Sequence, residues 1–272
     1  MPAPTWPPAT PPAPPTASAP PPTGRTRRGI AIVVALALLL GGGFVVGRWV
    51  IGDSSTSSSA TTPTTAAPTT LTDPGAVALT RLIVQQGDVA SAFNVQLLPG
   101  GDQVRGQTTL DLCNGRFATE ADRAARLQDV VDDAQGNSIV STEAVLYRSV
   151  ADSVRAFDEL RKVAASCPHS PVTSPVGEPT VATRFNARPD ATWPQTPGVD
   201  RLAYSFDTTD QLGQNLPSVA VYLRRGRALM GVYFQHPEAS QPAVGGQTSL
   251  SGIVGVFAGR LARLPSSVVD GP

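Results

Sequence analysis

SVADSVRAFDELRKVAAS, residues 149–166, decides the fold because it is the clearest helix in the chain. Ser149 and Asp152 have the spacing of a capping box, in which the two side chains satisfy backbone N–H groups of the first turn. Apolar side chains then recur every three or four residues, as they do on one face of a helix. This stripe consists of Val150, Val154, Phe157, Leu160, Val163 and Ala164. The pattern predicts an amphipathic helix that packs against a larger apolar surface.

Segments on both sides of this helix have the apolar and β-branched character of strands. A second long helix is predicted over residues 250–264, and a first helix over residues 73–86. A proline-rich loop is expected up to residue 198. The strand-like pieces are 95–98, 107–112, 124–132, 138–147, 201–207, 218–223 and 228–235. We therefore expect an α+β domain, with an antiparallel sheet of about five or six strands and two main helices.

One transmembrane helix is predicted in front of this domain, over residues 29–52, GIAIVVALALLLGGGFVVGRWVIG. Residues 29–47 carry no charge and no proline, and at ~1.5 Å per residue they span about 28 Å, close to the hydrocarbon thickness of a bilayer. Arg25, Arg27 and Arg28 precede the apolar run, so the N-terminus should be cytoplasmic and the large domain extracytoplasmic. A cleaved signal peptide is the alternative. The length of the apolar run and of the leader before it favour an uncleaved anchor in the cell membrane.

The chain divides into four parts by composition. Residues 1–28 are proline-rich and predict a disordered cytoplasmic tail, either a solvated leader or a docking segment. Residues 29–52 form the span, and residues 53–72 form a flexible stalk of Ser, Thr, Ala and Pro. Residues 73–272 form the extracytoplasmic domain. The 21 basic and 21 acidic side chains give a net charge of zero, so we expect no nucleic-acid partner.

The chain contains two cysteines, Cys113 and Cys167, and both follow the predicted span. Thiols oxidise outside the membrane, so a disulfide between them is expected. A catalytic thiol would need a base, and His169 lies near Cys167 only in a loop-like segment. A zinc site is disfavoured because the two cysteines and two histidines have no recognised metal-binding spacing. We therefore expect no metal and no cofactor.

Candidate site residues are few, and none of them forms a catalytic constellation. Arg224, Arg225 and Arg227 lie in a predicted hairpin turn, where they can bind an anionic envelope polymer or simply keep the turn polar. Trp193 can stack on a ligand from the long loop that ends at residue 198, or it can cover the sheet edge. If the domain has a cleft, this loop should border it, since loops of that length are usually functional.

Two short motifs add a family resemblance. LCNG at Leu112–Gly115 precedes ELRKVAASCP at Glu159–Pro168, after a tail, one span and a Thr/Ser/Pro stalk. This order is similar to the actinobacterial extracytoplasmic sensor domains typified by the outer domain of the mycobacterial kinase PknH. The resemblance implies two helices on an antiparallel sheet, a ligand-binding cleft and a Cys113–Cys167 bond. The second disulfide and the kinase domain of that family have no counterpart here.

These patterns together predict a single-pass membrane protein whose outer domain binds an envelope ligand or a protein partner without catalysis, as a sensor or scaffold. The alternative is an envelope hydrolase that acts on cell-wall polymers. An enzyme should gather several acids and bases in one cleft, whereas a binding domain can line its cleft with neutral and apolar groups.

Overall fold

A computed structural model describes most of the predicted extracytoplasmic domain. The predicted tail, transmembrane helix and stalk lie outside the described residues. Within the part of the chain that the structure describes, no helix is both long and apolar enough to cross a membrane. The described residues are 74–107, 112–113, 115–167, 172–174, 177–187, 190–209, 215–237, 239 and 241–271.

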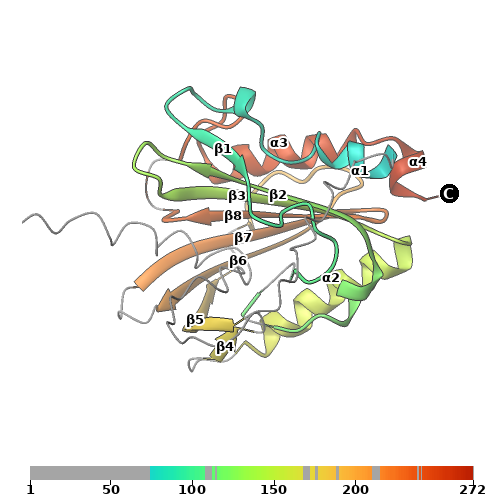
Figure 1. The fold of residues 1–272 in the computed structure, drawn as a ribbon, viewed down its shortest axis with the longest axis horizontal. Helices are drawn as coiled ribbons and strands as arrows, with labels where there is room; N and C mark the ends of the chain where they lie inside the picture. Colours follow the sequence, from blue (N-terminus) through green and yellow to red (C-terminus); the bar gives the residue numbers. More distant parts are fainter. Residues whose placement is uncertain are drawn as a thin grey trace, which may run out of the picture. The chain divides into compact units, whose positions relative to one another are not determined.

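An eight-stranded antiparallel sheet organises the described residues (Figure 1). Its strand order is β1-β2-β3-β8-β7-β6-β5-β4. The contact between β3 and β8 joins two hairpins that are far apart in the chain, β2–β3 and β7–β8. The strands are β1 (Asn94–Leu97), β2 (Arg123–Asp132), β3 (Ser138–Tyr147), β4 (Val172–Ser174), β5 (Gly177–Ala187), β6 (Asp200–Thr209), β7 (Asn215–Arg225) and β8 (Ala228–Gln235).

The α+β class, the antiparallel sheet and the two main helices are confirmed, but the sheet is larger than predicted. Strands β4 and β5 lie in the segment that the sequence indicated to be a proline-rich loop. They form one border of the sheet, and Pro179 of β5 falls at the irregularity of the β4–β5 ladder between the pairs Thr173–Thr180 and Ser174–Gly177, where prolines are tolerated. Proline content was therefore a poor guide in this segment.

Helices cover both faces of the sheet (Figure 1). On one face lie α1 (Pro74–Leu79), α3 (Leu250–Ala262) and α4 (Ser266–Val269), and on the other lies α2 (Val150–Ala165). Two short 3-10 helices, η2 (Gln86–Asp88) and η3 (Ala118–Asp122), lie in the connections before β1 and β2. The predicted first helix is too long. It ends early because the backbone N–H of Val84 donates to the buried Thr142 hydroxyl of β3, at 3.0 Å, instead of to a helical carbonyl.

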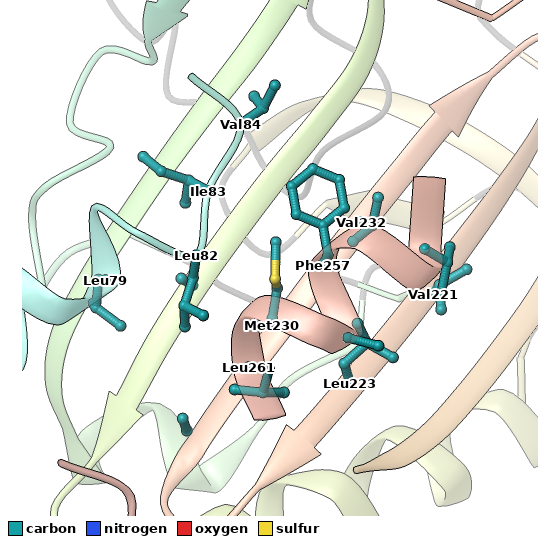
Figure 2. Packing of buried hydrophobic residues seen from close by; sticks show 14 of the residues in the cluster. Leu79, Leu82, Ile83, Val84, Val221, Leu223, Met230, Val232, Phe257 and Leu261 are labelled. Atoms are coloured by element: carbon teal, nitrogen blue, oxygen red, sulfur yellow. The ribbon is translucent and has the colours of Figure 1, made fainter. Parts of the chain in front are cut away.

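The main hydrophobic core lies between the sheet and the α1/α3 layer. Figure 2 shows Leu79 and Leu82 beside Met230 of β8, with Phe257 and Leu261 of α3 above the sheet. The predicted helix over residues 250–264 is confirmed as α3, and its side chains Ile253, Val254, Phe257 and Leu261 are fully or almost fully buried. Ser249 caps α3 by accepting a hydrogen bond from the Gly252 N–H at 3.1 Å.

Helix α2 begins where the sequence predicts, and Phe157 and Leu160 of the predicted stripe are buried. The first turns, however, bury a different face. The Ser149 hydroxyl accepts from the Asp152 N–H at 3.2 Å, which confirms the cap. Val150 and Val154, which the predicted stripe includes, are 37% and 39% exposed. The buried positions are Ser153, Ala156, Phe157 and Leu160. Small side chains let the helix approach the sheet closely there, and the Ser153 hydroxyl reaches the Gly226 carbonyl at 2.5 Å.

The predicted disulfide is confirmed. Cys113 and Cys167 are bonded, with Cα atoms 5.6 Å apart and 54 residues between them in sequence. The bond ties the segment before η3 to the end of α2. Both half-cystines belong to the second hydrophobic cluster, which fills the space between α2 and the sheet.

Candidate functional site

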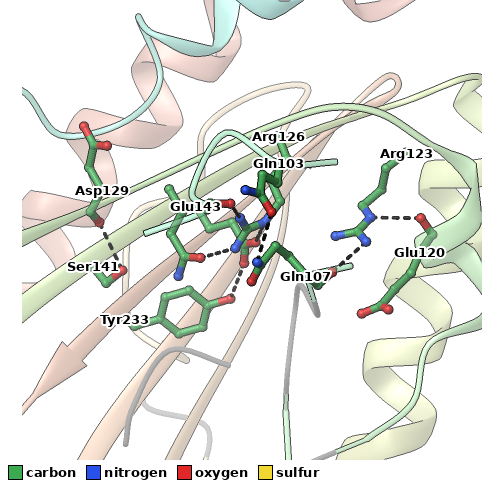
Figure 3. Close-up of polar contacts among 11 residues, drawn as sticks. Gln103, Gln107, Glu120, Arg123, Arg126, Asp129, Ser141, Glu143 and Tyr233 are labelled. Atoms are coloured by element: carbon green, nitrogen blue, oxygen red, sulfur yellow. Dashed lines mark hydrogen bonds and ion pairs between the residues drawn. The ribbon is translucent and has the colours of Figure 1, made fainter. Parts of the chain in front are cut away.

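The sheet face toward α2 carries a buried ion pair. Arg126 of β2 and Glu143 of β3 lie 2.7 Å apart between Nε and Oε1, and their side chains are 4% and 3% exposed. The other donors of Arg126 reach the Gly100 carbonyl, at 2.9 Å, and the Gln128 side-chain oxygen. The Tyr233 hydroxyl of β8 donates to Glu143 Oε2 at 3.4 Å. Figure 3 shows these side chains meeting over the sheet.

Gly231 makes room for Tyr233 in this cluster. A Cβ atom at Gly231 would lie 2.5 Å from the Tyr233 hydroxyl oxygen, closer than real Cβ atoms approach. The Tyr233 side chain therefore lies back over its own strand, and any larger residue at 231 would move it. Gly231 also pairs with Glu143 in the β3–β8 ladder, so the space over the glycine lets the Tyr233 hydroxyl lie beside the Glu143 carboxylate.

Arg123 forms a second polar site at the start of β2, next to η3. Its Nε donates to the Glu120 carbonyl at 2.9 Å, and its Nη2 donates to the Gln107 carbonyl at 2.7 Å. Figure 3 shows the guanidinium between these two backbone segments. The residue is 5% exposed, and its Nη1 has no hydrogen-bond partner among the described residues. Burial lowers the pKa of Arg123, and the nearby Glu120 acts in the opposite direction.

A pocket of about 330 Å³ opens beside Arg123. One wall is the turn that precedes the undescribed residues 108–111, and the other is η3 with the first residue of β2. Arg105 lies exposed on the turn, and Glu120 supplies the carboxylate of the lining. The lining residues are Val104, Arg105, Gly106, Glu120, Ala121 and Arg123. Among the described residues, this arrangement gives a small, mostly polar pocket with two guanidinium groups and one carboxylate.

The three arginines of the predicted patch do not converge on one surface. Arg224 forms an ion pair with Asp200, and its guanidinium lies 5.9 Å from the Phe157 ring centre on the α2 side. Arg225 instead donates to the carbonyls of Leu261 and Leu264 at the end of α3, at 3.1 and 2.6 Å. Arg227 donates to the Val268 carbonyl of α4 at 2.6 Å. Each of them binds a neighbouring element of the fold, and a role in ligand binding stays a prediction.

Trp193 packs against the main core and is partly buried. The Arg201 guanidinium lies 5.7 Å from the centre of its ring and donates to its carbonyl at 3.2 Å. Arg201 is itself held by Asp190, with 3.0 Å between Nε and Oδ2. These contacts hold the Trp193 side chain against the main core. Both predicted roles, ligand stacking and covering the sheet edge, stay predictions.

Sequence reasoning missed Arg123, Arg126, Glu143 and the pocket. Arg126 and Gln128 occupy alternate positions of a predicted strand, a pattern typical of a solvent-facing surface. The sequence did contain one signal for these residues. Two adjacent predicted strands, β2 and β3, both carry charged side chains in their middle. Sequence alone does not indicate that the 98–107 segment and α2 cover this face.

Asp129 provides a pH-dependent test of the fold. It lies half-buried on β2, between Gln128 and Val130, and no hydrogen bond to its carboxylate is formed by the described residues. Burial raises the pKa of Asp129 to about 6. The folded state therefore binds the proton more tightly than the unfolded state, so this group supports folding at pH 4 and loses that effect as the pH rises from 4 to 6.

Asp129→Asn should accordingly stabilise the domain at pH 7 and leave its stability at pH 4 unchanged. Without solvent screening, the pKa shift would correspond to about 3 kcal/mol in the free energy of unfolding. Because Asp129 is partly exposed, the expected gain in the free energy of unfolding is about 1 kcal/mol, or about 2–4 °C in the unfolding midpoint. Thermal unfolding at both pH values measures it. Asp158→Asn, at an exposed position of α2, is the control and should change the midpoint little. An equal gain for Asp129→Asn at pH 4 and pH 7 would contradict the assignment.

The fold and site thus define an α+β domain with a small polar pocket next to a buried ion pair. No known family model matches the chain, and no curated protein matches its sequence. Among solved structures, it is similar to the extracellular domain of PknH from Mycobacterium tuberculosis, with 13% identity and a TM-score of 0.36. The match covers 64% of this chain and 80% of that one. The expected resemblance is confirmed only as a distant likeness of fold.

Proposed function

We propose that the protein is a single-pass membrane protein whose outer domain, residues 73–272, binds a ligand or a protein partner at the cell envelope. In this proposal residues 29–52 span the cell membrane with the N-terminus in the cytoplasm, and residues 53–72 hold the domain away from the bilayer. The domain acts as a sensor or scaffold and does not catalyse a reaction.

Sequence and structure support different parts of this proposal. The apolar run and the arginines before it support the anchor and its orientation. The Cys113–Cys167 bond supports an oxidising environment for the domain, because disulfides persist outside the cytoplasm and are rare within it. The 54-residue separation also makes the bond an effective constraint on the unfolded chain.

The pocket at Arg123 is the observation that carries the binding role. A buried guanidinium with an unbonded Nη1 lines a pocket of about 330 Å³, which lies at the small end of the size range of ligand sites. Buried polar groups in folded proteins nearly always have a partner. The Nη1 atom itself is enclosed by the protein, so the binding role is supported by the pocket and its charged lining.

The chemistry of this lining favours binding over hydrolysis. Glycoside hydrolysis uses a pair of carboxyl groups, one on each side of the scissile bond, and the described lining supplies only that of Glu120. Amide hydrolysis needs an activated nucleophile or a metal-bound water, and the lining residues that the structure describes offer neither a hydroxyl nor a thiol side chain. Two guanidinium groups and one carboxylate are suited to holding a polar ligand in one orientation.

Binding without turnover is the expected result for the full chain, purified in detergent and mixed with soluble fragments of cell-wall polymers. A bound ligand raises the unfolding midpoint in a saturable way, because it stabilises only the folded state. Product release is followed on the same samples by mass spectrometry. Turnover that survives purification and disappears in Glu120→Gln would contradict the proposal and favour the envelope hydrolase. A saturable midpoint shift with the fragments unchanged would support it.

A further inference from the structure

We propose that the side chain of Gln86 closes the outer edge of β1 and thereby keeps two copies of this chain from pairing through that edge. Strand β1 forms one border of the sheet (Figure 1). The backbone N–H and C=O groups along such a border are a template for another strand, and natural proteins protect them. In this chain the protection comes from one glutamine side chain.

The pairing of β1 with β2 shows which backbone groups of β1 point outward. The Leu98 N–H, just after β1, donates to the Gln128 carbonyl of β2 at 3.1 Å. In an antiparallel pair, the backbone groups of alternate residues point toward the partner strand. The N–H and C=O groups of Val95 and Leu97 therefore point away from β2. Among the described strands, none pairs with β1 on that side.

Gln86 occupies part of this outer edge with its side-chain amide. Its Nε2 donates to the Phe93 carbonyl at 2.9 Å, and its Oε1 accepts from the Val95 N–H at 2.9 Å. One amide thus supplies a donor and an acceptor to two outward groups of the edge, where a neighbouring strand would place its peptide groups. Leu97, the next outward residue, is 47% exposed, so the rest of the edge is open to solvent.

Asp88, two residues after Gln86 in the 3-10 helix η2, fixes the backbone from which the Gln86 side chain extends. The Asp88 carboxylate accepts from the Gln85 N–H at 2.8 Å and forms an ion pair with Arg260 of α3. The Gly245 N–H also donates to the Asp88 carbonyl, at 2.9 Å. Because these contacts hold η2 against α3, Gln86 can cap the edge at the cost of ordering only its own side chain.

The sequence of β1 lacks the usual protection of an edge strand. Its four residues, NVQL, include no charge and no proline. Without the Gln86 amide, two β1 edges can pair antiparallel about a twofold axis, with Val95 of each copy opposite Leu97 of the other. Both residues point outward, so each of these two pairs would exchange two hydrogen bonds. The edge is therefore self-complementary, and the partner that it fits is a second copy of this chain.

Sedimentation equilibrium of the full chain in detergent measures the Kd of self-association, with wild type as the reference. Gln86→Ala should lower this Kd at least ~10-fold, because neither copy has to give up two hydrogen bonds before pairing. Adding Leu97→Pro to Gln86→Ala should restore the wild-type Kd, since proline removes an outward N–H and spares the bonds to β2. Gln195→Ala, at an exposed position before β6, is the matched control and should leave the Kd unchanged.

Hydrogen exchange of the β1 amides reports on the edge directly. In wild type, the Val95 amide should exchange more slowly than the Leu97 amide, because it donates to Gln86. In Gln86→Ala, both amides should exchange fast in dilute samples and slowly in concentrated ones. Asp88→Asn loosens η2 without touching β1 and should lower the Kd about 2–5-fold. This variant decides the question if Gln86→Ala fails to fold.

The inference would be overturned if folded Gln86→Ala kept the wild-type Kd, or if its tighter self-association persisted when Leu97→Pro was added. The second result would place the contact on another surface. If Gln86→Ala does not fold, a wild-type Kd for Asp88→Asn would have the same meaning. Equal exchange rates of the Val95 and Leu97 amides in wild type would contradict the cap itself.

Discussion

Arg126→Met should lower the free energy of unfolding by about 3–5 kcal/mol. The substitution leaves the Glu143 carboxylate buried without its cation, and the carboxylate is only 3% exposed. Glu143→Leu should have a cost of similar size, since it leaves the Arg126 guanidinium in the same position. Denaturant unfolding of the full chain, followed by circular dichroism, measures both changes.

The double variant Arg126→Met/Glu143→Leu should recover most of the lost stability, because two apolar side chains can replace a buried ion pair at little net cost. Arg161→Met is the matched control. Its ion pair with Asp158 is half-exposed on both sides, so the expected loss is below about 1 kcal/mol. A cost below about 1 kcal/mol for Arg126→Met, or a double variant as unstable as the sum of the single ones, would contradict the account of a buried, coupled pair.

Removal of the disulfide should have the second large effect. Replacing Cys113 and Cys167 together by serine frees a loop with a 54-residue separation, which the chain-entropy model values at roughly 4 kcal/mol. For a domain of this size, the unfolding midpoint should fall by about 10 °C. Thermal unfolding of wild type with and without reductant provides the comparison, and both reduced wild type and the double variant should show the lower midpoint. A midpoint unchanged by either treatment would contradict a constraining role.

Local patterns in the sequence predicted the parts of the fold that depend on neighbouring residues. The β2–β3 hairpin follows from two strand-like runs around a polar turn, in which Asp133 accepts from the N–H groups of Gln135 and Asn137, at 2.8 Å each. Helix α3 follows from apolar residues that recur every three or four positions, and these residues are the ones that face the core. Both elements carry their signal within one short, continuous stretch of the chain.

The remaining features depend on contacts between distant segments. The buried face of α2 was predicted wrongly in its first turns, because Ser153 and Ala156 carry no apolar signal, yet they are buried where the helix approaches the β7–β8 turn. The same reason hides the candidate site. Arg126 meets Glu143 only through the β2–β3 pairing, and Arg123 is buried only because the Gln107 segment folds over it. A pattern of alternating polar residues does not reveal what covers them.

The account depends most directly on the placement of the described domain outside the cell membrane, where its two cysteines oxidise. Thiol trapping in intact cells tests this placement. Cells are quenched in acid, denatured and treated with a thiol-alkylating reagent, and the full chain is then analysed by mass spectrometry without reduction. The account predicts that the Cys113 and Cys167 peptides are linked and that neither cysteine is alkylated. Both cysteines alkylated in the natively produced, full-length protein would contradict it.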